Sequence, residues 1–116
     1  MFVPEKFFME QIELGKSGVR VSRLGIGTWA WGDGLYWGYG RGYGAADLHQ
    51  AFDETVRAGI NFFDTAEVYG IGKSETFLGE FLRAAENAQN APIRDGAHIA
   101  TKFFPLPWRL TRGQVV

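Results

Sequence analysis

The residues that decide the fold are Gly59 to Gly79, with the sequence GINFFDTAEVYGIGKSETFLG. The apolar run Asn61–Phe63 ends at an acidic residue, Asp64. Such an uninterrupted run is typical of a strand covered on both faces, as in a parallel sheet with helices packed outside it. The chain then passes through a loop that contains Tyr69 and enters a predicted helix near Ser74. Catalytic residues of α/β folds gather where such strands end, so Asp64 and Tyr69 are candidates for acid–base chemistry.

Helical periodicity is found on both sides of this strand. Apolar residues at helical spacing predict a helix over 46–58, which Gly59 ends because a left-handed backbone costs glycine little. Asp47 is expected to cap that helix, with Gln50 reciprocating. The same spacing predicts that the helix near Ser74 buries one face, formed by Phe77, Leu78, Phe81, Leu82 and Ala85.

The remaining segments are shorter. Alternating apolar residues with a glycine-containing turn over 15–18 predict a β-hairpin from Met9 to Val21, and strands are expected over 24–27 and 97–101. Residues 32–44, GDGLYWGYGRGYG, are expected to form a long, mobile loop. Residues 1–8 are interpreted as a leader, and residues 106–116 as the start of a third helix.

The alternation of strands and helices places the chain in the α/β class. Strands separated by helices predict a parallel sheet with right-handed crossovers. Three parallel strands by themselves leave two open edges, and one side of the sheet is only partly covered.

Composition excludes several classes of function. The chain has 116 residues and a net charge of -1, so the basic surface of a nucleic-acid binder is missing. No apolar run approaches the roughly 20 residues that span a bilayer, so no membrane partner is expected. The absence of cysteine removes thiolate metal sites, no metal site is predicted, and a reducing, cytoplasmic location is favoured.

Two stretches of the sequence resemble phosphate-binding motifs but lack structural features that those motifs require. The sequence Gly25–Ala30 spells G-x-G-x-x-A, but no helix is expected to follow it, as a dinucleotide-binding turn requires. The sequence Gly72-Lys73-Ser74 opens a helix after a strand, as in a P-loop. A P-loop needs a glycine five residues earlier, where this chain has Glu67, so phosphate binding stays a distant alternative.

Three residues at strand ends are candidates for one catalytic group. Asp64 ends one strand, Tyr69 follows it in the loop, and Lys102 follows the next strand. Neighbouring parallel strands lie about 4.8 Å apart, so Lys102 can pair with Asp64 if the two strands are adjacent. An ammonium close to a phenol makes the phenol a better acid, and a phenol can give its proton to a carbonyl oxygen during reduction. Taken singly, each residue is more often structural, and only their joint placement favours chemistry.

Several segments together resemble the aldo-keto reductase family. They are GIGTW at 25–29, NFFDTAEVYG at 61–70, Ser74-Glu75 with Leu78-Gly79, and ATK at 100–102. The similarity covers about residues 10–110, nearly the whole chain. The resemblance implies a (β/α)₈ barrel with an amino-terminal hairpin at its base, and reduction of a small aldehyde or ketone by NADPH. The fold expected here is therefore a partial TIM barrel of about three βα units behind a hairpin, in a domain covering residues 9–116.

The resemblance also implies roles for individual residues. The family's catalytic aspartate, tyrosine proton donor and lysine match Asp64, Tyr69 and Lys102. Gly27, Thr28 and Trp29 match the turn along the nicotinamide end of the cofactor, where Asp64 also approaches the ribose. Trp29 and Trp31 are expected to line the substrate pocket.

The family's fourth catalytic residue, a histidine, lies beyond Val116, and neither His49 nor His98 is placed to replace it. Most of the adenosine-phosphate site lies in later loops as well. A (β/α)₈ barrel needs roughly 250 residues, so the chain is expected to be a truncated form with little or no activity alone. The alternative is a non-catalytic fragment of a split or interrupted gene that needs a complementary barrel fragment.

Overall fold

The centre of the molecule is a three-stranded parallel sheet. The computed structural model describes residues 9–105, in which β3 (Ile26–Gly27), β4 (Phe62–Asp64) and β5 (His98–Ala100) lie in the order β3-β4-β5. Asp64 is opposite Gly27 on one side and opposite Ala100 on the other. The predicted parallel sheet is confirmed, and so is the adjacency of the strands that precede Tyr69 and Lys102.

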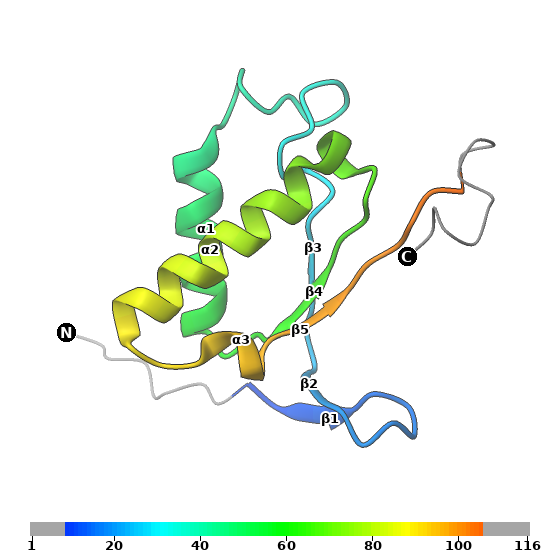
Figure 1. Ribbon diagram of the computed structural model, residues 1–116, viewed down its shortest axis with the longest axis vertical. Coiled ribbons are helices and arrows are strands. Elements are labelled where there is room, and N and C mark those ends of the chain that lie inside the picture. The colour runs from blue at the N-terminus through cyan, green and yellow to red at the C-terminus, as the bar shows by residue number, and fades with distance from the viewer. Residues whose placement is uncertain (1–8, 106–116) are drawn as a thin grey trace.

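A β-hairpin packs at the amino-terminal end of the sheet. Strands β1 (Gln11–Glu13) and β2 (Arg20–Ser22) pair antiparallel, as the alternating pattern predicts. Ser22 and Asn61 exchange two hydrogen bonds, from the Ser22 amide to Asn61 Oδ1 at 2.7 Å and from the Asn61 amide to Ser22 Oγ at 3.0 Å. The hairpin therefore lies at the opposite end of the strands from Asp64 (Figure 1).

Helix α1 (Ala45–Arg57) begins earlier than its expected cap. Gly44 is the N-cap, and Asp47 lies in the first turn, where its carboxylate accepts a hydrogen bond of 2.8 Å from the Gly44 amide. The prediction that Asp47 caps the helix with Gln50 is wrong, because the helix starts before Asp47. The predicted end is confirmed, since Gly59 has a φ of +80° directly after Ala58.

The core lies between the sheet and two helices on one side of it (Figure 1). Helix α2 (Lys73–Gln89) follows a short 3₁₀ turn, η1 (Tyr69–Gly72), and its predicted apolar face is buried except for Phe77, which is half-buried. One cluster of buried residues joins α1, β4, α2 and the loop that follows β3: Trp31, Leu48, Phe52, Phe63, Leu78, Phe81, Leu82 and Ala85.

The other connections are irregular. Residues 28–44 contain no helix, and an isolated bridge pairs Tyr39 with Tyr43. A four-residue helix, α3 (Ile93–Gly96), precedes β5. The predicted leader and third helix lie outside the described residues. Within residues 9–105, no helix combines the length and apolar character needed to cross a membrane.

Two glycines attach the irregular loop to the start of α2. A Cβ on Gly70, which has a φ of +59°, would lie 2.9 Å from the carbonyl carbon of Gly32. A Cβ on Gly32 would in turn lie 2.4 Å from the Cβ of Lys73. This close approach requires glycine at both positions, and it places the loop next to Tyr69.

Candidate active site

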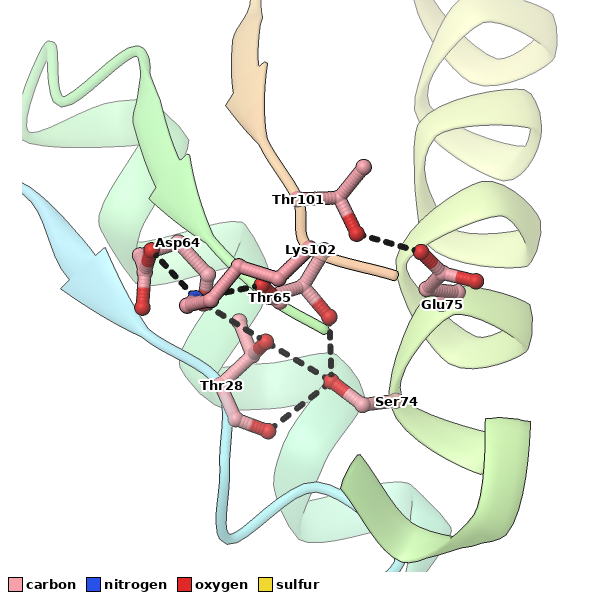
Figure 2. Close-up of polar contacts among 7 residues, drawn as sticks. All are labelled: Thr28, Asp64, Thr65, Ser74, Glu75, Thr101 and Lys102. Atoms are coloured by element: carbon pink, nitrogen blue, oxygen red, sulfur yellow. Dashed lines mark hydrogen bonds and ion pairs between the residues drawn. The ribbon is translucent and has the colours of Figure 1, made fainter. Parts of the chain in front are cut away.

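The centre of the site is an ion pair between two strand ends. Asp64 is the last residue of β4, and Lys102 follows β5, which pairs with β4. The Lys102 ammonium donates to Asp64 Oδ1 at 2.9 Å and to the carbonyl oxygen of Thr65 at 2.7 Å (Figure 2). The side chains of Lys102 and Asp64 are 52% and 50% exposed, so a small molecule has access to both.

The ring of Tyr69 lies beside this pair. Lys102 Nζ is 5.0 Å from the centroid of the Tyr69 ring. Trp29 stacks on Tyr69, with ring centroids 6.1 Å apart and an interplanar angle of 24°. The structure therefore brings the three predicted catalytic side chains together, with Trp29 against the phenol.

The surroundings of Lys102 favour its charged form. The hydrogen bond to the Asp64 carboxylate is the main cause that raises the pKa of Lys102 above its usual value. Partial desolvation lowers this pKa, and the Tyr69 hydroxyl raises it further. The amine is thus a fixed positive charge next to the phenol.

The aromatic residues expected in the pocket occupy different environments. Trp29 is 46% exposed, stacks on Tyr36 with centroids 5.1 Å apart, and borders a hollow of about 560 Å³ between the loop and η1. Trp31 is only 6% exposed and packs edge-on against Phe81 in the core. Trp31 therefore does not line this hollow, because its ring packs against helix α2 in the core.

A chain of buried hydroxyl groups lies next to the ion pair, and sequence analysis did not find it. Ser74 Oγ lies 2.7 Å from Thr28 Oγ1, 2.9 Å from Thr65 Oγ1 and 2.9 Å from the Thr28 carbonyl oxygen (Figure 2). Thr28 Oγ1 also donates to the carbonyl oxygen of Asp64 at 2.9 Å. A possible signal in the sequence was three small hydroxyl residues, each next to a strand end or a helix start.

The phosphate-binding alternatives find no support in the geometry. Ser74 is fully buried, so it is not available to a phosphate or its metal ion, and Lys73 Nζ lies over the ring of Tyr39, 5.7 Å from its centroid. No helix follows Ala30, as expected, so the dinucleotide-turn requirement fails.

Neither histidine belongs to the site. His49 lies on α1, where its ring stacks on Phe81, and His98 begins β5 at the end away from Lys102. Among the described residues, no group of three or more histidine, acidic or cysteine side chains is placed to hold a metal ion.

Comparison with known proteins decides the family. A model of the aldo/keto reductase family matches residues 23–114, which include every candidate site residue. The chain belongs to the aldo/keto reductase family. The family assignment made from the sequence is thereby confirmed, and the family consists of oxidoreductases that act on carbonyl compounds and generally use NAD(P)H.

Two curated relatives of this aldo/keto reductase chain come from a plant and a bacterium. It is 40% identical over 111 residues to the chloroplastic pyridoxal reductase of Arabidopsis thaliana, covering 92% of this chain and 29% of the relative. It is 38% identical over 84 residues to the NADH-specific methylglyoxal reductase of Escherichia coli, covering 70% of this chain and 24% of the relative. The chain therefore spans a quarter to a third of the length of these relatives.

Solved structures of aldo-keto reductases have a similar fold. A thermostable aldo-keto reductase in complex with the inhibitor epalrestat matches with a TM-score of 0.67 and 25% identity, covering 92% of this chain and 35% of that protein. A second, from Bacillus halodurans in its holo form, matches with a TM-score of 0.60 and 29% identity, over 80% of this chain and 25% of that protein. The α/β fragment is therefore consistent with part of a TIM barrel.

The residues expected to meet the nicotinamide cofactor fit it only in part. Gly27 is exposed, faces Asp64 across the strand pair, and has open space where a Cβ would stand. Asp64 and Trp29 are also accessible. Thr28 does not fit, because it has no exposed surface, and its amide and hydroxyl both donate to the Asp64 carbonyl oxygen. Thr28 therefore offers no exposed surface to a cofactor in this arrangement, and its expected role stays a prediction.

Proposed function

We propose that this chain forms the proton-donating part of a carbonyl-reducing site. The observation that carries the proposal is the position of Lys102, whose ammonium contacts the Asp64 carboxylate and lies beside the Tyr69 ring. An acid, an amine and a phenol with half-exposed side chains suit reduction of an aldehyde or ketone.

Each residue has a separate role in the proposed reaction. Tyr69 gives its proton to the carbonyl oxygen of the substrate as negative charge develops there. Lys102 makes this transfer easier by stabilising the phenolate that remains, and Asp64 keeps Lys102 charged and oriented. A reduced nicotinamide, when bound, supplies the hydride.

Gly27, Trp29 and Asp64 are the proposed contacts of this chain with the nicotinamide end of the cofactor. The half-exposed Asp64 carboxylate is a suitable acceptor for ribose hydroxyls, and Gly27 lets a ligand approach the backbone. NADPH is proposed rather than NADH on the family resemblance alone, and the substrate is a small carbonyl compound. A cytoplasmic location stays a prediction.

For the fold, we propose that residues 9–116 form one domain equivalent to a hairpin and the first three βα units of a barrel. Later loops of the barrel would hold the adenosine phosphate and the fourth catalytic residue. The 116-residue polypeptide alone is therefore expected to show no turnover with NADPH and an aldehyde. Steady oxidation of NADPH by that polypeptide would contradict this expectation.

A chimera tests the chemistry directly. Residues 9–105 replace the matching segment of the Arabidopsis pyridoxal reductase, and reduction of pyridoxal and of simple aldehydes is followed by NADPH absorbance. We expect turnover in the chimera, and a fall in kcat of about 100-fold or more in Tyr69→Phe, because general acid catalysis contributes roughly 10²–10⁴-fold. Lys102→Met is expected to have an effect of similar size.

The control is Tyr36→Phe, since Tyr36 carries its hydroxyl on the exposed loop and is not a proposed proton donor. Its kcat should stay within a factor of about three of the unsubstituted chimera. A folded chimera in which Tyr69→Phe is as active as the parent would refute the assignment of Tyr69.

The open edge of β5 favours a second candidate function. Within the described residues, β5 pairs with β4 alone, and Ile99, Phe103 and Phe104 are 45%, 59% and 48% exposed. This surface suits a complementary barrel fragment that supplies the next strand and helix. The test uses the part of the Arabidopsis pyridoxal reductase that follows the matched segment. When this part is mixed with the 116-residue polypeptide, we expect a heterodimer on size-exclusion chromatography.

A further inference from the structure

The buried hydroxyl groups of Thr28, Ser74 and Thr65 lie directly behind the Asp64–Lys102 pair. Their residues are 0%, 0% and 1% exposed, although each carries a polar group. Thr28 follows β3, Thr65 follows β4, and Ser74 lies in the first turn of α2. The three hydroxyls therefore join three elements at the rim of the sheet that carries the site.

The distances allow one consistent assignment of the three hydroxyl protons. Thr65 Oγ1 donates to Ser74 Oγ, Ser74 Oγ shares its proton between Thr28 Oγ1 and the Thr28 carbonyl oxygen, and Thr28 Oγ1 donates to the carbonyl oxygen of Asp64. Every proton then has an acceptor, and the chain of donors ends on the backbone of Asp64. Hydrogen bonds in such a buried chain strengthen one another, so the chain resists distortion.

This chain fixes both acceptors of the Lys102 ammonium. One acceptor is the carboxylate of Asp64, whose own carbonyl oxygen receives the Thr28 hydroxyl and the Thr28 amide. The other acceptor is the carbonyl oxygen of Thr65, whose side chain is bound to Ser74. The peptide between Asp64 and Thr65 is thus held by two hydrogen bonds from Thr28 to its carbonyl oxygen.

The next residue of α2 restrains the strand that carries the amine. Glu75 Oε1 accepts a hydrogen bond of 2.5 Å from the hydroxyl of Thr101, which directly precedes Lys102 (Figure 2). The first turn of α2 therefore contacts the ends of all three strands. Ser74 does not act as a helix cap, since α2 has Gly72 as its N-cap and shows no side-chain capping bond.

We propose that Ser74, through Thr28 and Thr65, is a positioning residue that holds the Asp64 carboxylate and the Thr65 carbonyl group toward Lys102. The inference rests on the proposed function for its meaning in catalysis, but the geometry it concerns can be measured without turnover. A purely structural set of groups in this position would be replaceable by apolar side chains of equal volume without any effect on Lys102.

The test compares Thr65→Val, which keeps the shape and removes the hydroxyl, with Thr65→Ser, which keeps the hydroxyl. Ser74→Ala removes the middle of the chain. The matched control is Thr76→Val, because the Thr76 hydroxyl lies on the same helix and bonds only to the Gly72 carbonyl oxygen. The pKa of Lys102 is measured by NMR titration of ¹³C-labelled lysine, in the 116-residue chain and in the chimera, with the signal assigned from Lys102→Arg.

We expect the raised pKa of Lys102 to fall toward its ordinary value in Thr65→Val and Ser74→Ala, and to stay unchanged in Thr65→Ser and Thr76→Val. In the chimera, kcat should fall on the order of 10- to 100-fold in the first two variants with KM nearly unchanged, because small misplacements of reacting groups cost that much.

A Lys102 pKa equal to that of the parent in a folded Thr65→Val or Ser74→Ala variant overturns the proposal. If Ser74→Ala does not fold, Thr65→Val decides, since it preserves the packing volume. The proposed function fails separately, when Tyr69→Phe leaves kcat unchanged, because the titrations that test the positioning role compare Thr65 and Ser74 variants that all keep Tyr69.

Discussion

At the scale of single residues, the site combines an exposed ion pair with a buried support. An exposed pair such as Asp64–Lys102 contributes little to folding stability, because solvent screens it and two long side chains lose freedom. The supporting hydroxyls of Thr28, Thr65 and Ser74 are fully buried and bonded. The molecule thus keeps its reactive groups accessible and removes from water only the groups that orient them.

The pH dependence of stability follows from the raised pKa of Lys102. The pKa of lysine in an unfolded chain is about 10.4. In the folded chain the ammonium of Lys102 keeps its proton to a higher pH. Above about pH 10 the unfolded state binds fewer protons, so the free energy of unfolding falls as pH rises through the folded pKa, and below that range the contribution is fully present. Burial, followed by the charge of Asp33, raises the pKa of Tyr43 and acts in the same direction.

Urea unfolding of the parent and of Lys102→Met between about pH 8 and pH 11 measures this effect. The alkaline decline should be shallower in Lys102→Met and unchanged in the control Lys16→Met, which alters the hairpin turn. Equal slopes in the parent and in Lys102→Met would show that the pair does not carry the pH dependence.

Gly70 should be far less tolerant of a side chain than Gly15. Both have a φ near +60°, but a Cβ on Gly15 meets nothing within 4 Å, whereas one on Gly70 would lie 2.9 Å from the Gly32 backbone. We expect Gly15→Ala to cost about 1 kcal/mol of unfolding free energy, and Gly70→Ala roughly 3 kcal/mol, because Gly32 must also move. Chemical denaturation measures both, and similar losses would argue against the close contact.

The pairing of Asp64 with Lys102 was predictable from sequence only on the condition that their two strands are neighbours, which the structure shows. The burial of Trp31 and Thr28 was not predictable in the same way. Trp29 and Trp31 lie two positions apart in an irregular loop, where no periodicity assigns a side chain to the core or to the surface. The buried role of Ser74 was not predictable either, because its partners, Thr28 and Thr65, approach it only after the sheet has formed.

At the scale of elements, the two long helices, α1 and α2, each begin after a glycine. Gly44 precedes α1 and Gly72 precedes α2, and neither helix has a side-chain cap. In α1, Asp47 compensates by accepting the Gly44 amide and placing a negative charge at the positive end of the helix. Helix boundaries were predicted well where a glycine ended the helix and less well where the cap had to be chosen among polar residues.

Asp47→Ala should therefore destabilise the fold by about 1 kcal/mol, since it removes both the hydrogen bond and the favourable charge. Gln50→Ala is the control, because Gln50 is exposed and takes no part in the start of the helix. Its effect should lie within about 0.5 kcal/mol. Thermal unfolding followed by circular dichroism measures both losses of stability. A larger loss in Gln50→Ala than in Asp47→Ala would contradict this assignment of the helix start.

At the scale of the whole molecule, the described part of the chain has helices on one side of its sheet and an open edge at β5. Ile99 faces a hollow of about 250 Å³ that Leu78, Leu82 and neighbouring residues line, next to the unpaired edge of β5. Exposed apolar side chains beside an unpaired strand favour association with another chain.

Sedimentation velocity should show that the 116-residue polypeptide self-associates as its concentration rises. Ile99→Lys is expected to reduce this association, because an ammonium in the hollow opposes apolar contact. Ile71→Lys is the control, since Ile71 is 92% exposed but lies on η1, away from β5. A monomeric parent, or equal association in Ile99→Lys, would exclude this edge as the contact surface.

The contact between Gly32 and Gly70 has a consequence for how this enzyme family can diversify here. The tip of the aromatic loop, with Leu35 91% and Tyr36 72% exposed, is free to accept new side chains and so to select different carbonyl compounds. Its root is not free, because a side chain at Gly32 would meet Lys73 at the start of α2, and one at Gly70 would meet the backbone of Gly32 beside Tyr69, the proposed proton donor. Substitutions that alter substrate choice are therefore expected at the tip of the loop, at residues such as Leu35 and Tyr36. Gly32 and Gly70 are expected to stay glycine, because they hold the loop against the start of α2.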